Sequence, residues 1–406
     1  MVLLLLAGTS CRSSRPSYVF EDQPRPVLAE LGIDGARNPK LAITPAGVLF
    51  LLAAGNEQGQ TRLFFAMSHD GGDTFMPPVA VSEPGEQVSS HGQNSPSLAI
   101  GATEIYAVWE QMQTEGPNKL MFPRSLSFGH SFEKPIRVTD KQTPSFNGFS
   151  TLGVAPTGDV YVAWLDGRDA DAQPGTFSIY LAKSTDRGAS FGPNVRVGQT
   201  ACPCCRPTLA FGSNGQILVI WRKVFAGDIR DMVVSSSSDG GASFAAPVRV
   251  AEDNWKLSGC PESGPAVAVK GGTVYVVWYS EGGDQPGLRL TQSEDSGETF
   301  SKARLLSGDV LDANHPSLSV SDDGRVLAVF EGRASDGGGG WGAKMAYFMR
   351  LDDSGNAKPV ALVKRKDSVS RPVIAAGTAD RAFMAWTESG KQKSTVFLLR
   401  GRKANK

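Results

Sequence analysis

The segment Ser68-His69-Asp70-Gly71-Gly72-Asp73-Thr74-Phe75 decides the fold, because its pattern of Ser, Asp, Gly, Ser or Thr, and Phe recurs along the chain. Three further copies occupy residues 184–191, 237–244 and 293–300. The Asp carboxylate of such a turn can accept hydrogen bonds from the turn's own backbone, and the Gly at the fifth position supplies a positive φ. The motif therefore predicts a repeated structural hairpin.

A second repeat, which contains two apolar strands, has the same period. Each copy opens with a small or polar residue, usually Pro, and continues with an apolar alternation, a Gly-containing turn and a second apolar strand. Successive openings are 51 to 58 residues apart, which is typical of a repeat architecture. The openings are Pro39, Pro96, Ser150, Pro207, Pro265, Pro316 and Pro372, and we expect the second strands to end at Trp109, Trp164, Trp221, Trp278, Phe330 and Trp386.

These repeats predict an all-β fold, a seven-bladed β-propeller with four-stranded blades. A short fourth strand follows each turn motif, but the last repeat, which opens at Pro372, ends before its own fourth strand. We expect residues 24–31, Pro-Arg-Pro-Val-Leu-Ala-Glu-Leu, to form an N-terminal outer strand that completes the C-terminal blade. Closure of this kind would hide the sheet edges.

The composition excludes two classes of partner. The 406 residues carry 41 basic and 41 acidic side chains, and the isoelectric point is near 6.9. A chain without net charge has no global electrostatic reason to bind nucleic acid or an anionic membrane surface.

Residues 1–18 are expected to be an export and anchoring segment. An apolar run at 1–8, too short to span a bilayer, is followed by Thr9-Ser10-Cys11, which is typical of a lipoprotein signal that ends at a lipidated cysteine. A plain cleaved signal is the alternative. Residues 19–406 would then be a single propeller domain, located in the periplasm or on the outer membrane and attached to the membrane only through a lipid on Cys11.

The turn motif resembles the Asp-box, or BNR repeat, of sialidases and other Asp-box propellers, and the resemblance covers residues 24–400. It implies a protein that binds a glycan or another anionic ligand on its loop face, with sialidase-like hydrolysis as the catalytic version. Sialidases have six blades, so the seventh repeat is a departure. This departure weakens any transfer of catalytic positions by rank.

Loop arginines are the ligand-binding candidates. Sialidases hold the substrate carboxylate with three arginines, whose planar guanidinium binds a carboxylate through two hydrogen bonds. By this resemblance Arg37, Arg206 and Arg371, each one or two residues before an opening proline, would hold the anionic group. The loops that follow the second strands add Arg168, Arg222 and Arg333.

The catalytic candidates also follow from the resemblance. Sialidases use a Tyr nucleophile activated by a Glu, together with an Asp as acid and base. Tyr279, Glu281 and Asp166 are the residues of this chain that could take those roles. The structural alternative is that these carboxylates pair with loop arginines across the blades.

Four cysteines outside the N-terminal segment form a separate group. Cys202, Cys204 and Cys205 share one loop, and Cys260 lies in the corresponding loop of the next repeat. Disulfides are expected in an exported protein, and four cysteines permit three pairings. The alternatives are a Cu or Zn centre, with a nitrogen from His91 or His315, or a redox site. Either would make the chain a non-catalytic envelope protein, and a scaffold for an envelope protein partner is a further alternative.

Overall fold

The computed structural model describes residues 18–404 apart from 141–145, 171–173, 213, 336–341, 352–357, 378–379 and 391–392. Residues 1–17, which include Cys11, lie outside the described part. The named elements are strands, with the exception of the four-residue helix α1 (Val27–Glu30). Within the described part of the chain, no helix is both long enough and apolar enough to cross a membrane.

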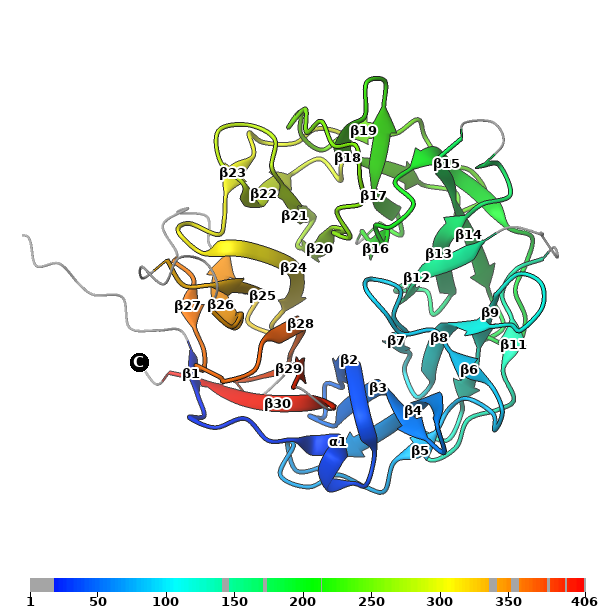
Figure 1. Cartoon of the computed structure of the whole chain (residues 1–406). Helices are drawn as coiled ribbons and strands as arrows, with labels where there is room; N and C mark the ends of the chain where they lie inside the picture. Colours follow the sequence, from blue (N-terminus) through cyan, green and yellow to red (C-terminus); the bar gives the residue numbers. More distant parts are fainter. Residues whose placement is uncertain are drawn as a thin grey trace, which may run out of the picture.

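The strands form antiparallel sheets that are arranged around a central axis (Figure 1). Four sheets of four strands, one of six and one of eight are present among the described residues. The first three along the chain contain β2 (Asp34–Ile43), β3 (Leu49–Glu57), β4 (Gln60–Ser68) and β5 (Val79–Ala80); then β6 (Gln87–Val88), β7 (Ser97–Ile100), β8 (Ile105–Met112), β9 (Lys119–Phe122), β10 (Arg124–Ser125) and β11 (Ile136–Arg137); then β12 (Asn147–Val154), β13 (Val160–Asp166), β14 (Phe177–Ser184), β15 (Val195–Ala201), β16 (Thr208–Phe211), β17 (Ile217–Phe225), β18 (Ile229–Ser237) and β19 (Val248–Arg249). The other three contain β20 (Ala266–Lys270), β21 (Thr273–Ser280), β22 (Gly287–Ser293) and β23 (Arg304–Leu305); then β24 (Leu311–Val320), β25 (Val326–Arg333), β26 (Met345–Leu351) and β27 (Val360–Ala361); and finally β28 (Val369–Ala376), β29 (Arg381–Ser389), β30 (Ser394–Lys403) and β1 (Tyr18–Phe20).

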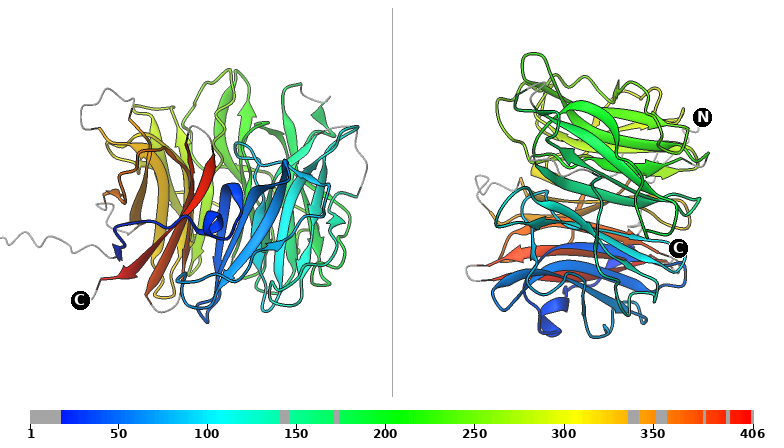
Figure 2. Two further views of the ribbon diagram at one scale, coloured as in Figure 1. Left: turned by 60° about the horizontal axis from the view of Figure 1, so that its bottom comes forward. Right: turned by 90° about the vertical axis from the view of Figure 1, so that its right-hand side faces the viewer.

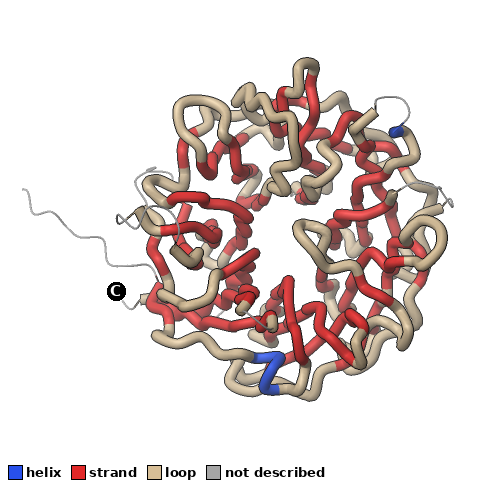
Figure 3. The backbone as a smooth tube through the Cα atoms, viewed as in Figure 1, coloured by secondary structure: helices blue, strands red, loops and turns tan. Residues whose placement is uncertain are grey.

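The opening strand of each repeat lies nearest the centre (Figure 1). These strands contact one another in the order β2, β7, β12, β16, β20, β24 and β28, and β28 in turn contacts β2. The eight-stranded sheet consists of two four-stranded halves, β12–β15 and β16–β19, joined by the single pair Ala201 and Lys223. The turned views of Figure 2 show the strands running between two faces that carry the loops, and Figure 3 shows strands and loops alternating around the ring.

One large aromatic residue on each of six second strands fills the space between neighbouring sheets. The side chains are fully buried and comprise Trp109, Trp164, Trp221, Trp278, Phe330 and Trp386. The expectation that the strands end at these residues is wrong, since β17, for example, continues to Phe225 and pairs with β18 throughout. Backbone pairing therefore continues beyond the apolar core, toward the loop face.

The repeated turns have the hydrogen bonds that their sequence predicts. In the first copy the Thr74 backbone N–H donates to Asp70 Oδ1 at 2.9 Å, and the Gly72 N–H donates to Ser68 Oγ at 2.7 Å. Gly72 has a φ of 84°, which explains the glycine at this position. The same bonds recur around Asp186, Asp239 and Asp295. The closing phenylalanines of the four copies pack against the apolar clusters between sheets.

The N-terminal strand lies earlier in the chain than expected. β1 pairs antiparallel with β30, with Tyr18 opposite Lys403. The segment predicted as a strand, 24–31, makes one isolated bridge, from Arg25 to Leu398, and then turns into α1. Pro24 and Pro26 lack the N–H groups that a strand needs for pairing, which is why the segment does not continue as a strand.

Replacing the Asp of one turn should destabilise the fold modestly. Hydrogen bonds from the Ser190 hydroxyl and the turn backbone lower the pKa of Asp186 to about 2. Because Asp186 is exposed, we expect Asp186→Ala to lower Tm by only about 1–3 °C at pH 7. A carboxyl whose pKa is depressed stabilises the fold above its unfolded pKa, near 3.9, and loses this effect as pH falls toward the folded value. The difference in Tm between Asp186→Ala and the unsubstituted protein, measured by calorimetry, should therefore become smaller below pH 4.

The neighbouring exposed residue of the same turn, Thr185, provides the control. Thr185→Ala should leave Tm unchanged at every pH. Equal melting temperatures for Asp186→Ala and the unsubstituted protein at pH 7 would contradict the structural role of the turn.

Candidate functional site

Three cationic side chains from different sheets meet at the centre of the ring. Lys40 on β2, Arg206 before β16 and Arg371 on β28 line a cavity of about 300 Å³, together with Gln93 and His315. We call this space the cation cavity. The sheets converge here, so residues far apart in the sequence share one small volume.

The positive charges of the cation cavity have no acidic partner among the described residues. No described carboxylate forms an ion pair with Lys40, Arg206 or Arg371, and Nε and Nη2 of Arg206 and Nε of Arg371 are buried without a hydrogen-bond partner. Burial and the charges of the two arginines hold the pKa of Lys40 well below its usual range. Burial and Arg371 likewise lower the pKa of Arg206. Such a site favours an anion.

Backbone hydrogen bonds and backbone conformation both hold the residues of the cation cavity in place. Gln93 Oε1 accepts hydrogen bonds from the backbone N–H groups of Arg206 at 3.1 Å and Gly264 at 2.7 Å, so a loop of the second sheet reaches the fourth and fifth repeats. Arg371 and His315, each directly before a proline, adopt left-handed φ values of 49° and 50°. Strained residues of this kind are held in place by their surroundings and gather at functional sites.

The expected clamp of three arginines is present only in part. Arg206 and Arg371 do meet, but Arg37 is bonded instead to Thr61 Oγ1 at 2.7 Å and to the Ser90 carbonyl at 3.2 Å. Lys40 occupies the position expected for Arg37. The sequence contains a signal for it, because Lys40 is the one charged residue that directly follows an opening residue.

A buried acid, Glu331, separates the cation cavity from a neighbouring cleft. It accepts hydrogen bonds from Lys344 Nζ at 2.8 Å and from the Arg371 backbone N–H at 2.6 Å, and it lies 3.2 Å from His315 Nδ1. Burial raises the pKa of Glu331, but His315 and Lys344 outweigh it and lower the value to about 2. Glu331 is therefore an anion whose charge is already compensated.

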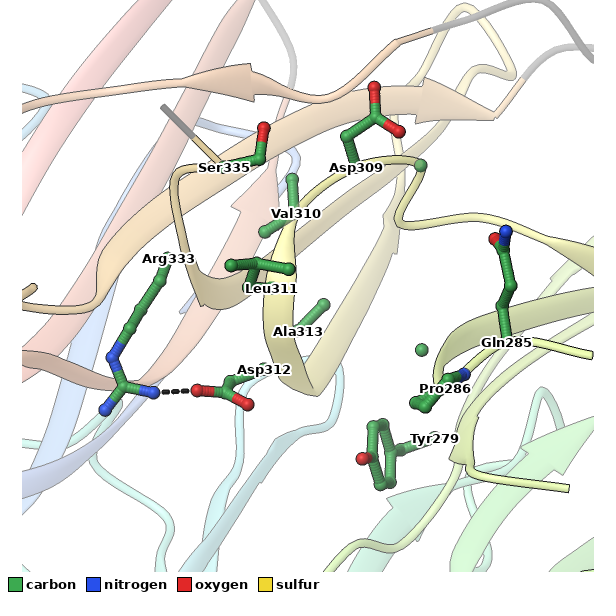
Figure 4. Close-up of a pocket in the computed structure, with 12 residues that line it drawn as sticks. Tyr279, Gln285, Pro286, Asp309, Val310, Leu311, Asp312, Ala313, Arg333 and Ser335 are labelled. Carbon is green, nitrogen blue, oxygen red and sulfur yellow. Dashed lines mark hydrogen bonds and ion pairs between the residues drawn. The ribbon is translucent and has the colours of Figure 1, made fainter. Parts of the chain in front are cut away.

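The neighbouring cleft lies between the fifth and sixth repeats, which form the sheets β20–β23 and β24–β27. Two adjoining pockets of about 760 and 430 Å³ share Tyr279, Asp312 and Arg333, and the smaller one also includes Glu281 and Lys344. We call them together the loop cleft. Arg333 is ion-paired with Asp312, and Tyr279 lies across the pocket from this pair (Figure 4). Arg333 therefore contributes less free positive charge than the arginines of the cation cavity.

Tyr279 and Glu281, both proposed from the sequence, are in contact. The Tyr279 hydroxyl donates to Glu281 Oε1 at 2.7 Å. Burial and this carboxylate raise the pKa of Tyr279, so the neutral phenol is the resting form. Because Glu281 accepts a hydrogen bond from the phenol, its carboxylate is positioned to remove the phenol proton when the Tyr279 oxygen attacks a substrate.

The structure places Asp166 in a separate, local arrangement. Asp166 is fully buried and accepts hydrogen bonds from Trp164 Nε1 and from both the backbone N–H and Nη2 of Arg168, each at 2.8 Å. Trp386 Nε1 donates in the same way to Glu388. No described contact joins Asp166 or Arg168 to Tyr279.

Arg222 connects two neighbouring repeats through hydrogen bonds. Its guanidinium is fully buried and donates to the carbonyl oxygens of Tyr279 at 2.7 Å, Ser263 at 3.0 Å and Arg230 at 3.1 Å. It also lies over the Trp255 ring. Arg222 therefore holds the strand that carries Tyr279.

The cysteines meet as their loops predict. Cys204 and Cys260 form a disulfide, whereas Cys202 and Cys205 are free and buried. The sulfur atoms of Cys202, Cys204 and Cys205, here called the sulfur cluster, lie within 4.8 Å of one another. With Cys204 bonded to Cys260, two free thiols remain, which is fewer than the three or four protein ligands of zinc sites. A metal centre would need Cys204 released.

The two candidate histidines bond elsewhere. The His91 backbone pairs with Asn94, and His315 Nε2 lies 3.2 Å from the Glu262 carbonyl. Neither belongs to the group formed by the sulfur cluster.

The solved structures that resemble this chain are distant in sequence. A polysaccharide lyase of family PL25, an ulvan lyase, is 14% identical and covers 90% of this chain and 93% of its own, with a TM-score of 0.57. An α-L-arabinanase from Penicillium chrysogenum is 12% identical and covers 75% and 92%, with a TM-score of 0.52. A Hadza microbial sialidase is 13% identical and covers 85% and 73%, with a TM-score of 0.49.

No protein-family model and no curated protein matches the sequence. The chain thus has distant structural similarity to carbohydrate-active enzymes that are β-propellers.

Proposed function

We propose that this protein binds an anionic glycan, with an acidic group of the glycan in the cation cavity and neighbouring sugar rings in the loop cleft. The observation that carries the proposal is the set of three positive side chains without an acidic partner among the described residues. A carboxylate or sulfate would supply the missing acceptors for Arg206 and Arg371.

The two spaces are close enough for one oligosaccharide to occupy both. Glu331 contacts His315, which lines the cation cavity, and Lys344, which lines the loop cleft. The ulvan lyase neighbour has been solved with a fragment described as GlcA(1-4)Rha3S, which carries a uronate and a sulfate. An acidic polysaccharide of this kind is therefore the ligand class that we propose.

We extend the proposal to hydrolysis, with Tyr279 as nucleophile and Glu281 as its base. The hydrogen bond between the two side chains supports these roles. Asp166 is not included, because its oxygens are occupied by Trp164 and Arg168. The acid that would protonate the leaving group is not assigned.

We also propose that the fold is a propeller of seven blades and that β1, paired with β30, closes the ring. The circular order of contacts among the seven opening strands supports the count, and the single pair between Ala201 and Lys223 supports dividing the eight-stranded sheet. The shared hydrogen bonds of the four turns support their assignment as Asp-boxes. Export, and a lipid on Cys11, remain proposals from the sequence.

Lys40→Met should raise Tm of the ligand-free protein at pH 7, because it removes one of three crowded positive charges. Since the folded pKa of Lys40 is lowered, its charge destabilises the fold below that pKa, and the effect disappears as pH rises toward the unfolded value, near 10.4. The advantage of the variant should therefore shrink between pH 7 and pH 10 in low-salt calorimetry. Lys134→Met, at an exposed position, is the control. A pH-independent difference, or a lower Tm at pH 7, would contradict the crowding.

Arg206→Met should weaken binding of a GlcA–Rha3S oligosaccharide by about tenfold to a hundredfold, because it removes a charge-assisted hydrogen bond to the acidic group. Titration calorimetry measures the change. Arg402→Met, at an exposed position on β30, should bind like the unsubstituted protein. Unaltered affinity in a folded Arg206→Met variant would rule out the cation cavity as the binding site.

Tyr279→Phe should abolish hydrolysis while binding stays within about twofold, because only the nucleophilic oxygen is removed. Turnover of a fluorogenic sialoside and of the acidic oligosaccharide provides the assay. Tyr180→Phe, outside the loop cleft, is the matched control and should retain activity. Equal rates for Tyr279→Phe and the control would show that Tyr279 is not the nucleophile.

A further inference from the structure

The sulfur cluster contains a free thiol next to a disulfide. Cys202 Sγ lies 3.8 Å from Cys204 Sγ, which is bonded to Cys260, and 3.6 Å from the thiol of Cys205. Cys202 is thus in contact with a sulfur atom that a thiolate can attack. Neither glycan binding nor hydrolysis uses this group.

The surroundings of Cys202 favour its thiolate. Arg230 Nη1 donates to Cys202 Sγ at 3.0 Å. The hydrogen bond from Cys205 and the nearby charges of Arg230 and Arg222 lower the pKa of Cys202 to about 6, although burial opposes them. Burial and Cys202 raise the pKa of Cys205, so Cys205 remains the protonated donor of the pair.

The charge balance of the region agrees with this assignment. Arg222 and Arg230 are both buried, and neither forms an ion pair with a carboxylate among the described residues. Their other donors bond to carbonyl oxygens of Ser263, Tyr279 and Leu257. Buried charges normally have a partner of opposite sign, and the sulfur of Cys202 is the group in contact that can supply it.

The geometry points to an intramolecular thiol–disulfide exchange site. The Cys202 thiolate attacks Cys204 Sγ, the Cys202–Cys204 bond forms, the Cys204–Cys260 bond breaks, and Cys260 leaves as a thiolate. One disulfide and one thiolate are present before and after the step, so no external oxidant or reductant is needed. Cys205 donates its hydrogen bond to Cys202 beforehand and exchanges no electrons.

The exchange replaces a buried thiolate with an exposed one. Cys202 is fully buried, whereas Cys260 is exposed and lines the loop cleft beside Trp255 and Tyr279. The freed Cys260 thiolate can react with a thiol-reactive or disulfide compound that enters the cleft. The substrate class of the site is therefore a disulfide or another soft electrophile small enough for a pocket of about 430 Å³.

Trapping of the freed thiolate tests the exchange. The folded protein is incubated with N-ethylmaleimide at pH 7 without reductant, then unfolded, reduced and labelled with deuterated N-ethylmaleimide before peptide mass spectrometry. Cys260 should take the first label progressively, while Cys202 and Cys204 take the second. In Cys202→Ser the first label on Cys260 should be lost, whereas Thr185→Ala, an exposed position outside the sulfur cluster, is the control and should retain it at the rate of the unsubstituted protein. Circular dichroism checks that both variants are folded.

Two outcomes would overturn the inference. One is a protein in which Cys260 takes no first label; the other is labelling of Cys260 at the same rate in Cys202→Ser, since attack by Cys202 would then not be required. Because no glycan is present in the experiment, its outcome does not depend on whether the proposed glycan binding is correct.

The pH dependence of the same reaction provides a second readout that does not depend on removing a cysteine. The trapping rate should rise with a midpoint near pH 6, where the Cys202 thiolate forms. Arg230→Met should shift this midpoint upward, toward the ordinary thiol range near 8.5, while Arg230→Lys should shift it less. A midpoint that is the same in all three proteins would contradict the role of Cys202.

Discussion

The large aromatic residues of the second strands can be buried only between neighbouring sheets, and the rest of the structure depends on this constraint. Trp164 and Trp278, for example, are fully buried in clusters to which two adjacent sheets contribute. A sheet without a neighbour would expose that surface, so the sheets pack side by side around the axis, and the opening strands converge. The loops that precede those strands are brought together whatever their charge.

Because the loops converge, the cationic side chains of the cation cavity lie close together without a carboxylate partner among the described residues. Several other charged groups of the loop face form ion pairs: Asp166 with Arg168, Arg333 with Asp312, and Glu331 with Lys344. In the cation cavity, burial and neighbouring arginines lower the pKa values of Lys40 and Arg206, and buried nitrogens of Arg206 and Arg371 have no hydrogen-bond acceptor among the described residues. Arg222 and Arg230 also lack a carboxylate partner, but they donate to carbonyl oxygens, whereas the buried nitrogens of the cation cavity have no such acceptor among the described residues. This difference supports the proposed anionic ligand.

Much of the fold could be predicted from the sequence, because the repeat period and the turn motif depend on local interactions. The Asp and Gly of each turn bond and bend within eight residues, so their roles follow from the sequence. The contact of Tyr279 with Glu281 is similarly local, since Glu281 follows Tyr279 by two residues, directly after the end of β21.

Other features depend on partners that are distant in the sequence. Val27 and Leu28 are buried in a helix against the C-terminal sheet, and two prolines prevent a strand there. The pairing of Cys204 with Cys260 and the meeting of Lys40 with Arg371 depend on which loops the ring brings together. Asp166 could not be recognised as a structural acceptor until its bond to the buried Trp164 was visible.

A crystal structure of the protein with an acidic oligosaccharide such as GlcA–Rha3S tests the central claim most directly. The account predicts the uronate or sulfate in the cation cavity, with oxygen atoms about 3 Å from the guanidinium groups of Arg206 and Arg371. A bound oligosaccharide whose acidic groups face solvent, or one that occupies the opposite face of the ring, would contradict it.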